Sequence, residues 1–201
     1  ILCLSLFFCL TMSAGSTKRA KSPNGELTMK QADGPYAVEY QGKPVLRIEA
    51  QGYATDASVE NKSRLDFVRH LITDYTMLSG KRLHCINEAN EYAVDLNKGT
   101  RLVWRLYNDG VAFRYELTGL KLGVLPEEHT SYIIPEGTTR WMQRWSDGYE
   151  GFFPCSTTGE SRDRRWGYPS LFEPQEGIFV LLSEADITRR QSASCLRNDG
   201  D

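Results

Sequence analysis

The sequence has little of what would mark a nucleic-acid-binding or membrane-spanning protein. It carries 24 lysines and arginines against 26 aspartates and glutamates, so neither sign of charge is in clear excess. Such a balance gives no electrostatic surface that would attract nucleic acid or anionic lipid. No apolar run reaches the roughly 18 residues that a membrane-spanning helix needs. We therefore predict neither nucleic acid nor a membrane as a partner.

The motifs of well-known catalytic sites are also missing. The sequence contains no G-x-S-x-G nucleophile elbow, no P-loop, no dinucleotide fingerprint and no EF-hand calcium loop. His70, His84 and His129 stand apart and form no zinc-binding pattern. Isolated histidines are mostly satisfied or solvated, so we predict no catalytic or metal role for them. Carboxylate pairs that hydrolyse glycosides come from separate strands and leave no spacing signal.

Cysteine is scarce, and only Cys85, Cys155 and Cys195 lie beyond the first ten residues. An odd number allows at most one internal disulfide, and the wide spacing fits no zinc pattern. We expect three free thiols, with one disulfide as the alternative.

The first 15 residues, ILCLSLFFCLTMSAG, are strongly apolar and carry no charge. The run is too short for a membrane-spanning helix and ends in small residues, which is typical of a secretory signal peptide. Neither an initiating Met nor a basic segment precedes it, so we expect residues 1–15 to be a signal peptide that is incomplete at its N-terminus. Export to the periplasm or beyond is the predicted location. Residues 16–21 are expected to form a spacer without fixed structure, followed by a domain over 22–201.

The segment Arg101–Leu117, RLVWRLYNDGVAFRYEL, predicts a β-hairpin. Asp109-Gly110 is a favoured pair for a two-residue type I′ turn, because both central residues need a positive φ. A turn there pairs the apolar residues of one face: Leu106 with Phe113, Trp104 with Tyr115 and Leu102 with Leu117. The same register places Arg105 opposite Arg114, which is unfavourable.

Most of the remaining chain also shows the alternation of strands. Extended segments are predicted at Glu26–Ala32, Tyr36–Ile48 (a hairpin), Leu83–Leu96, Leu120–Leu125 and Ser131–Pro135. The spacing of apolar residues in Ser63–Ile72 favours a helix over a strand. The uninterrupted apolar run Gly177–Ser183 predicts a strand buried on both faces. These patterns predict an all-β, antiparallel protein, a sandwich of two large sheets.

Two features are candidates for function. The segment Trp141–Phe172 is rich in aromatic residues, which suit the flat faces of sugar rings but equally fill a core or pack under loops. Glu184 directly follows the apolar run, where a carboxylate either reaches solvent or meets a hard cation such as calcium. From the residues alone, packing is the preferred interpretation of the aromatics and solvent exposure that of Glu184.

Four segments, in their order along the chain, resemble the N-terminal domain of glycoside hydrolase family 97, a family of exported α-glucosidases and α-galactosidases of Bacteroides-type bacteria. They are Ser22-Pro23-Asn24-Gly25, Gly42-Lys43-Pro44-Val45-Leu46, Tyr107–Tyr115 (YNDGVAFRY) and Leu182–Asp186 (LSEAD). The resemblance covers roughly residues 22 to 201, and the YNDGVAFRYE string is its most specific part.

The resemblance implies a large β-sandwich of the galactose-mutarotase-like super-sandwich type, followed by a catalytic (β/α)₈ barrel. The catalytic carboxylates of the family lie in that barrel, so no catalytic residue is expected in this chain. The family binds calcium with glutamates from the barrel and one from the N-terminal domain. Glu184 matches that N-terminal glutamate by its place in the Ser-Glu-Ala motif. No substrate-binding residue is carried over.

The leading hypothesis is therefore the N-terminal portion of an exported, calcium-dependent enzyme. Its partners would be an α-glucan oligosaccharide or α-galactoside and the catalytic barrel of the same chain, and this portion alone would be inactive. The alternative is a stand-alone carbohydrate-binding β-sandwich without catalysis. Loss of glycan binding on substitution of Trp145 or Trp166 by Ala would favour that alternative.

Overall fold

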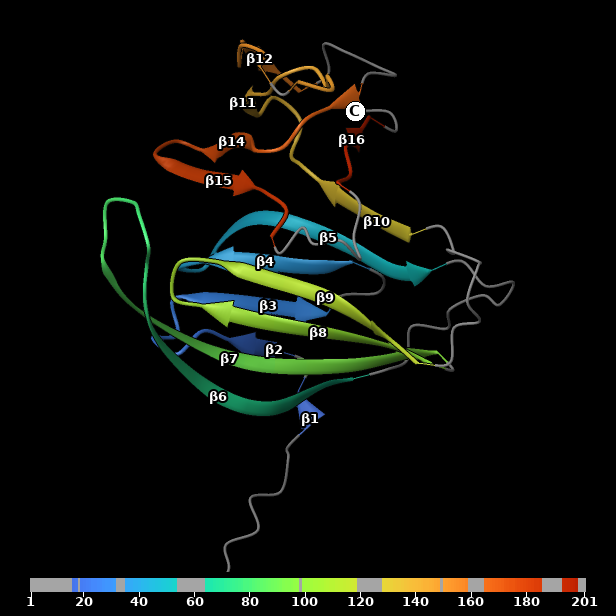
Figure 1. Cartoon of the computed structure of the whole chain (residues 1–201). Coiled ribbons are helices and arrows are strands. Elements are labelled where there is room, and N and C mark those ends of the chain that lie inside the picture. Colours follow the sequence, from blue (N-terminus) through green and yellow to red (C-terminus); the bar gives the residue numbers. More distant parts are fainter. Residues whose placement is uncertain are drawn as a thin grey trace, which may run out of the picture. The chain divides into compact units, whose positions relative to one another are not determined.

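The structure is a computed structural model, and its described residues form strands and no helix (Figure 1). Residues 16–17, 19–31, 35–53, 64–97, 99–118, 128–148, 150–158, 165–185 and 193–198 are described. The predicted signal peptide and the predicted strand Leu120–Leu125 lie outside these residues. Within them, no helix is long and apolar enough to cross a membrane. The chain forms two units, Ile1–Gln31 with Gly52–Glu128 (unit 1) and Ala32–Gln51 with His129–Asp201 (unit 2).

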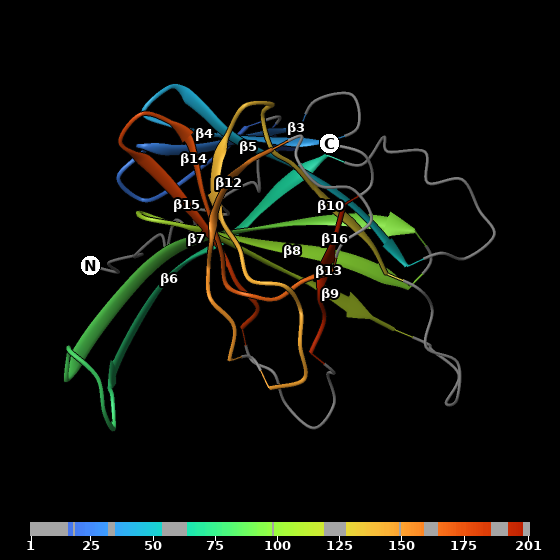
Figure 2. The same ribbon diagram turned by 90° about the horizontal axis from the view of Figure 1, so that it is seen from above.

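Unit 1 contains an antiparallel sheet in the order β1-β6-β7-β8-β9. Its strands are β1 (Ser16–Thr17), β6 (Leu65–Thr76), β7 (His84–Asn97), β8 (Thr100–Tyr107) and β9 (Val111–Leu117). An antiparallel pair, β2 (Arg19–Lys21) and β3 (Leu27–Gln31), packs against β6 and β8. The far ends of β6 and β7 project beyond β8 as a two-stranded ribbon (Figure 2).

The core of unit 1 lies between this sheet and the β2–β3 pair. Its buried apolar side chains alternate along the strands: Ala20, Leu27, Met29, Leu65, Tyr92, Val94, Leu102, Trp104 and Leu106. The hydroxyl of Tyr92 bridges the two layers, because it accepts a hydrogen bond from the backbone amide of Lys21 at 3.0 Å and lies 3.2 Å from its carbonyl oxygen. The alternation that predicted strands thus defines the buried face.

The β8–β9 hairpin confirms the predicted apolar face but not the predicted register. Trp104 lies opposite Phe113 and Leu102 opposite Tyr115, two positions away from the expected pairing. The amide of Tyr107 donates to the carbonyl of Gly110, so the loop is Asn108-Asp109 rather than Asp109-Gly110. None of these loop residues has a positive φ, so the type I′ turn expected there is not formed.

Two further expectations are wrong in unit 1. The segment Ser63–Ile72, for which a helix was favoured, lies in a strand from Leu65 onward, because β6 runs over Leu65–Thr76 and pairs with β7 along nearly its whole length. Backbone pairing with a long neighbour therefore overrides a weak helical spacing. Arg19–Lys21, expected to belong to a structureless spacer, pairs with Lys30, Met29 and Thr28 of β3, and its Ala20 is fully buried.

Unit 2 contains the confirmed hairpin of β4 (Tyr36–Tyr40) and β5 (Lys43–Tyr53). Its two-residue loop, Gln41-Gly42, has φ values of 49° and 79°, as a type I′ turn requires. Strand β10 (Glu128–Ile133) lies next to β5 in the sheet order. The hydroxyl of Ser131 on β10 donates to the carboxylate of Glu49 on β5 at 2.9 Å.

The rest of unit 2 forms a four-stranded sheet in the order β12-β11-β14-β15 and a short pair, β13-β16. These strands are β11 (Thr139–Trp141), β12 (Cys155–Thr157), β13 (Arg165–Trp166), β14 (Ser170–Gln175), β15 (Ile178–Leu182) and β16 (Leu196–Arg197). Strand β15 was expected to be buried on both faces. Instead Phe179 and Leu181 on one face are exposed, whereas Leu182 is buried, so the run covers a core on one side only.

Taken together, the described strands confirm an all-β, antiparallel protein of the β-sandwich class.

Candidate functional site

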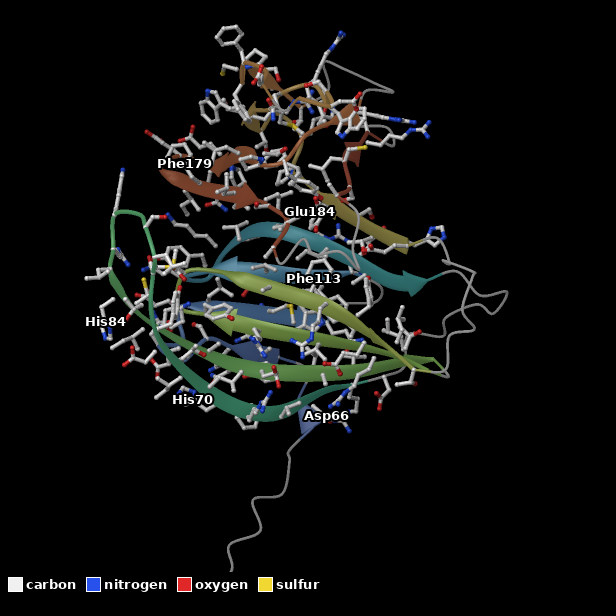
Figure 3. All side chains as sticks on the ribbon, in the orientation of Figure 1. Asp66, His70, His84, Phe113, Phe179 and Glu184 are labelled. Carbon is white, nitrogen blue, oxygen red and sulfur yellow. The ribbon has the colours of Figure 1, made fainter. Side chains whose placement is uncertain are left out.

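Glu184 lies two residues beyond the end of β15 and is half-buried (Figure 3). Both of its carboxylate oxygens lie 3.1 Å from the backbone amide of Ser194, which donates to them. The hydroxyl of Ser194 also donates to Oε1 at 2.6 Å. The carboxylate is therefore held in one orientation by a segment that returns ten residues later in the chain.

This arrangement fits a role for Glu184 as one ligand of a calcium ion. A carboxylate oxygen has two lone pairs, so the contacts with Ser194 leave acceptor capacity on the group. One carboxylate supplies at most two of the roughly six to eight oxygens that calcium takes. In the part of the chain that the structure describes, no group of three or more His, Cys, Asp or Glu side chains could hold a metal ion. The remaining ligands of such a site would have to come from elsewhere.

The predicted aromatic segment is divided between packing and exposed positions. Trp166 is buried, its indole nitrogen donates to the side chain of Asn198 at 2.9 Å, and the guanidinium of Arg140 lies 5.4 Å from its ring centroid. Trp166 therefore serves packing, as the preferred interpretation held. Trp145 and Phe152 are exposed.

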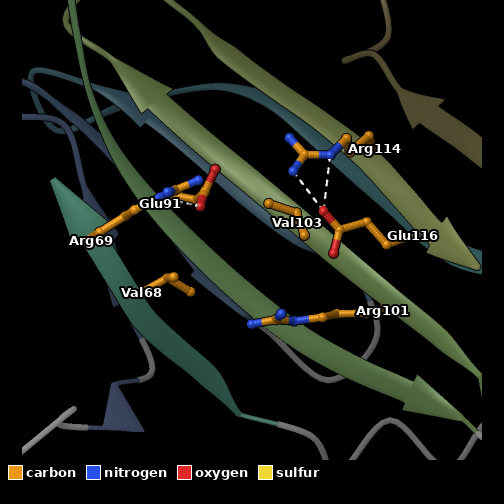
Figure 4. Close-up of a pocket in the computed structure, with 7 residues that line it drawn as sticks. All are labelled: Val68, Arg69, Glu91, Arg101, Val103, Arg114 and Glu116. Atoms are coloured by element: carbon orange, nitrogen blue, oxygen red, sulfur yellow. Dashed lines mark hydrogen bonds and ion pairs between the residues drawn. The ribbon is translucent and has the colours of Figure 1, made fainter. Parts of the chain in front are cut away.

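A second cluster of charged residues, which the sequence analysis missed, lies on the outer face of the sheet in unit 1 (Figure 4). The carboxylate of Glu91 on β7 is buried between two arginines from the neighbouring strands. Its oxygens lie 2.9 Å from Nε of Arg69 on β6 and 2.8 Å from Nε of Arg105 on β8. A pocket beside it is lined by Val68, Arg69, Glu91, Arg101, Val103, Arg114 and Glu116.

The electrostatics of this cluster favour stability over catalysis. Burial raises the pKa of Glu91, but the hydrogen bonds from Arg105 and Arg69 outweigh it and hold that pKa below its ordinary value. A glutamate that stays charged at neutral pH cannot act as a general acid. Arg114 is likewise paired, since it donates two hydrogen bonds to Glu116 at 3.1 and 2.6 Å. The ion pairs of Glu91 with Arg69 and Arg105 join β6, β7 and β8. The pair of Arg114 and Glu116 lies within β9.

Two of the histidines contact acids of a neighbouring strand. The imidazole of His70 on β6 contacts Glu88 on β7 at 3.1 Å, and that of His84 on β7 contacts Asp74 on β6 at 3.2 Å. Cys85, Cys155 and Cys195 are free thiols, as expected.

The sequence matches the family described as Glycosyl-hydrolase 97 N-terminal over residues 20–201. The chain belongs to this family. The match therefore covers all the described strands except β1 and the first residue of β2, and it confirms the resemblance carried by the four sequence segments. No curated protein matches the chain.

Solved structures share the fold of this family 97 chain. A beta-arabinopyranosidase is similar, with a TM-score of 0.70 and 23% identity. The match covers 90% of this chain and 34% of the beta-arabinopyranosidase chain. A variant of a Glycoside Hydrolase Family 97 enzyme from Pseudoalteromonas sp. strain K8 gives a TM-score of 0.59 and 18% identity. Another variant of that enzyme, in complex with panose, gives a TM-score of 0.57 and 17% identity. Each of these two matches covers 80% of this chain and 27% of the enzyme chain. The chain thus spans about a third or less of the length of these structures.

Proposed function

We propose that this chain is the N-terminal portion of an exported, calcium-dependent glycoside hydrolase that cleaves α-linked glucosides or galactosides. The family match over residues 20–201 carries the proposal. The similar structures include a beta-arabinopyranosidase and a family 97 enzyme in complex with panose, which supports a glycoside substrate. The apolar, uncharged residues 1–15 support export.

In this proposal the catalytic carboxylates belong to a barrel outside this chain. One carboxylic acid would protonate the glycosidic oxygen, and a second carboxylate would activate water or attack the sugar. The 201 residues would pack on that barrel and form part of the wall of the site. The match covers 34% and 27% of two of these structures, so the rest of their length leaves room for such a barrel.

Glu184 is the residue of this chain proposed to act at the metal. Calcium bound there would stabilise charge and orient the substrate. The amide and the hydroxyl of Ser194 hold the Glu184 carboxylate in a fixed orientation beyond β15. This preorganisation is the observation that favours Glu184 as a ligand rather than a solvated side chain.

The test is substitution of Glu184 by Gln in the complete enzyme, with Glu176→Gln as a control, because Glu176 is an exposed acid in the turn between β14 and β15. Glu184→Gln should weaken calcium binding and lower hydrolysis of a chromogenic α-glycoside, and Glu176→Gln should change neither. Equal calcium affinity of wild type and Glu184→Gln in titration calorimetry would remove Glu184 from the site. Absence of hydrolysis of any α-glucoside or α-galactoside by the complete protein would overturn the proposed activity.

The exposed aromatics Trp145 and Phe152 favour a second candidate, a carbohydrate-binding sandwich without catalysis. The 201-residue chain would then bind α-glucan oligosaccharides by itself, and Trp145→Ala would abolish that binding. A complete protein that hydrolyses glycosides would exclude this candidate.

A further inference from the structure

The ribbon formed by the far ends of β6 and β7 extends the core-facing side of the sheet beyond β8 (Figure 2). At the base of the ribbon, the side-chain amide of Asn90 on β7 donates to the backbone carbonyl of Lys21 in β2 at 2.9 Å. Farther out on the same side, Ile72 of β6 is 67% exposed and Ile86 of β7 is 64% exposed. A face that the second layer contacts at its base therefore leaves two isoleucines in solvent.

The two strands of the ribbon repeat one pattern of side chains on this face. Strand β6 carries His70–Asp74 (HLITD), and β7 carries His84–Glu88 (HCINE). Each segment has a histidine, an isoleucine and an acid at alternate positions, which point to the same side of a strand. The pairing of Ile72 with Glu88 places both sets on one face of the ribbon. We call this set the ribbon face: His70, Ile72, Asp74, His84, Ile86 and Glu88.

Because the two strands are antiparallel, the repeat gives the ribbon face an approximate two-fold symmetry. At one end the imidazole of His70 contacts Glu88 at 3.1 Å, and at the other end that of His84 contacts Asp74 at 3.2 Å. The two isoleucines lie between these pairs. Each end of the face therefore presents one imidazole ring and one carboxylate, whichever way along the strands it is approached.

The outer part of the ribbon has no third strand beside it among the described strands. Strand β1 pairs with β6 at Leu65 and Asp66, and β8 pairs with β7 as far as Ala89, so both stop short of it. Two strands alone are marginally stable in water and need further strands or a packed apolar face. The exposed isoleucines are the apolar group that the ribbon offers for such packing.

We propose that the ribbon face is an interface between two copies of this chain, related by a two-fold axis. Such an interface brings the same patch of both copies together, so the patch must be complementary to itself. The ribbon face meets this condition, because isoleucines can pack on isoleucines while each imidazole meets a carboxylate of the other copy. A glycan is the less favoured occupant, since the face offers no aromatic ring for a sugar.

The expected dimer is weak, and it is independent of the proposed activity. The ribbon face is small beside a standard protein interface, and small interfaces are typical of transient contacts. The dimer should therefore dissociate on dilution. A second copy would bury the isoleucines and join the two ribbons into one packed unit, which supplies the support that a lone ribbon lacks.

Sedimentation velocity of the complete enzyme over a series of concentrations tests the dimer. The wild type should pass from monomer to dimer as its concentration rises. Ile86→Lys should raise the dissociation constant at least about 100-fold, because the dimer would bury the new ammonium group twice. The control is Thr73→Lys, which adds the same charge at an exposed position on the opposite face of the ribbon. A wild type that stays monomeric, as it would if the rest of the same chain covered the face, would overturn the proposal. Equal weakening by both variants would also overturn it.

A pair of variants with opposite charges tests the self-complementarity. One carries Asp74→Lys with Glu88→Lys, and its ribbon face is wholly basic. The other carries His70→Glu with His84→Glu, and its ribbon face is wholly acidic. Each alone should lose the dimer through repulsion of like charges, and mixing the two should restore a dimer with one copy of each. A mixture that stays monomeric, although both variants give the circular dichroism of the wild type, would overturn the proposal.

These outcomes are separate from those that test the proposed function. Sedimentation reports association whether or not the enzyme hydrolyses a glycoside. A dimer without glycosidase activity would retain the interface and reject the proposed function. An active enzyme that is monomeric at every concentration would reject the interface alone.

Discussion

The hydroxyl of Ser194 lies 2.6 Å from Oε1 of Glu184, although ten residues separate the two in the sequence. The amide of the same serine lies 3.1 Å from each carboxylate oxygen. Hydrogen bonds to a charged acceptor are stronger than those between neutral groups, so this contact determines where the carboxylate points. Ser194 is thereby a positioning residue for the proposed calcium ligand.

Replacing Ser194 by Ala should therefore weaken calcium binding by the complete enzyme about 10-fold, the usual effect of losing a partner that orients a metal ligand. The backbone amide remains, so the site should be loosened rather than lost. Ser183→Ala is the control, because the Ser183 hydroxyl contacts only the backbone carbonyl of Glu184 among the described contacts. Titration calorimetry measures both affinities, and equal values for the two variants would contradict the positioning role.

Substituting Glu91 by Gln should lower the free energy of unfolding at pH 7 by about 1–3 kcal/mol, because it removes the buried charge that Arg69 and Arg105 hold. Glu116→Gln should cost less than about 1 kcal/mol, since that ion pair is largely solvated. Urea unfolding of the 201-residue chain measures both. Equal losses of unfolding free energy for the two variants would show that burial does not make the Glu91 ion pairs more stabilising than the exposed Glu116 pair.

The stability of the chain should also depend on pH through Glu91. Its pKa is lowered in the folded state, so its contribution is present above the unfolded pKa and is lost as the pH falls through the folded pKa. Wild type should lose stability below about pH 4.5, the ordinary glutamate value, more steeply than Glu91→Gln. Unfolding midpoints between pH 3 and 7 (roughly the range over which glutamates titrate) measure the difference, and parallel profiles would contradict it.

Apolar alternation sufficed to predict the faces of the β8–β9 hairpin but not its register. A displacement of the pairing by two residues keeps every side chain on its face, so the pattern cannot distinguish the two registers. The charges favour the observed one, because Arg105 lies opposite Ala112 instead of Arg114, and Arg101 lies opposite Glu116. The choice of Asp109-Gly110 relied on turn preference, which the observed loop does not follow.

The candidate site was less predictable, because its contacts join segments that are distant in the sequence. Glu184 was named from its place after the apolar run, and the resemblance favoured a calcium role for it, whereas its contact with Ser194 depends on a chain reversal that no local pattern shows. Burial of Glu91 likewise depends on the pairing of β6, β7 and β8. Alternation placed Arg105 on the outer face, but the acid that pairs with it could be named only once the register was known.

Trp166→Ala should destabilise the 201-residue chain by about 3–5 kcal/mol, because it opens a cavity in the core and removes the hydrogen bond to Asn198. Trp145→Ala, at an exposed position, should change stability by less than about 1 kcal/mol. Thermal unfolding measures both, and a small effect of Trp166→Ala would contradict its packing role. Loss of glycan binding by the Trp166 variant would accordingly reflect unfolding, so only Trp145 tests carbohydrate binding.

Gly99→Ala should destabilise unit 1 more than an alanine at another glycine of similar backbone conformation. Gly99 has a φ of 90°, and a Cβ there would overlap the backbone carbonyl oxygen of Thr118, whose amide donates to the Gly99 carbonyl at 2.7 Å. Gly137 has a φ of 76° but open space around it, so Gly137→Ala carries only the strain of about 1 kcal/mol. The added overlap should bring the cost of Gly99→Ala to roughly 2–4 kcal/mol, because the backbone of β8 and the end of β9 must separate. Urea unfolding with an unchanged m-value measures the difference, and equal costs would show that the Gly99–Thr118 contact yields without penalty.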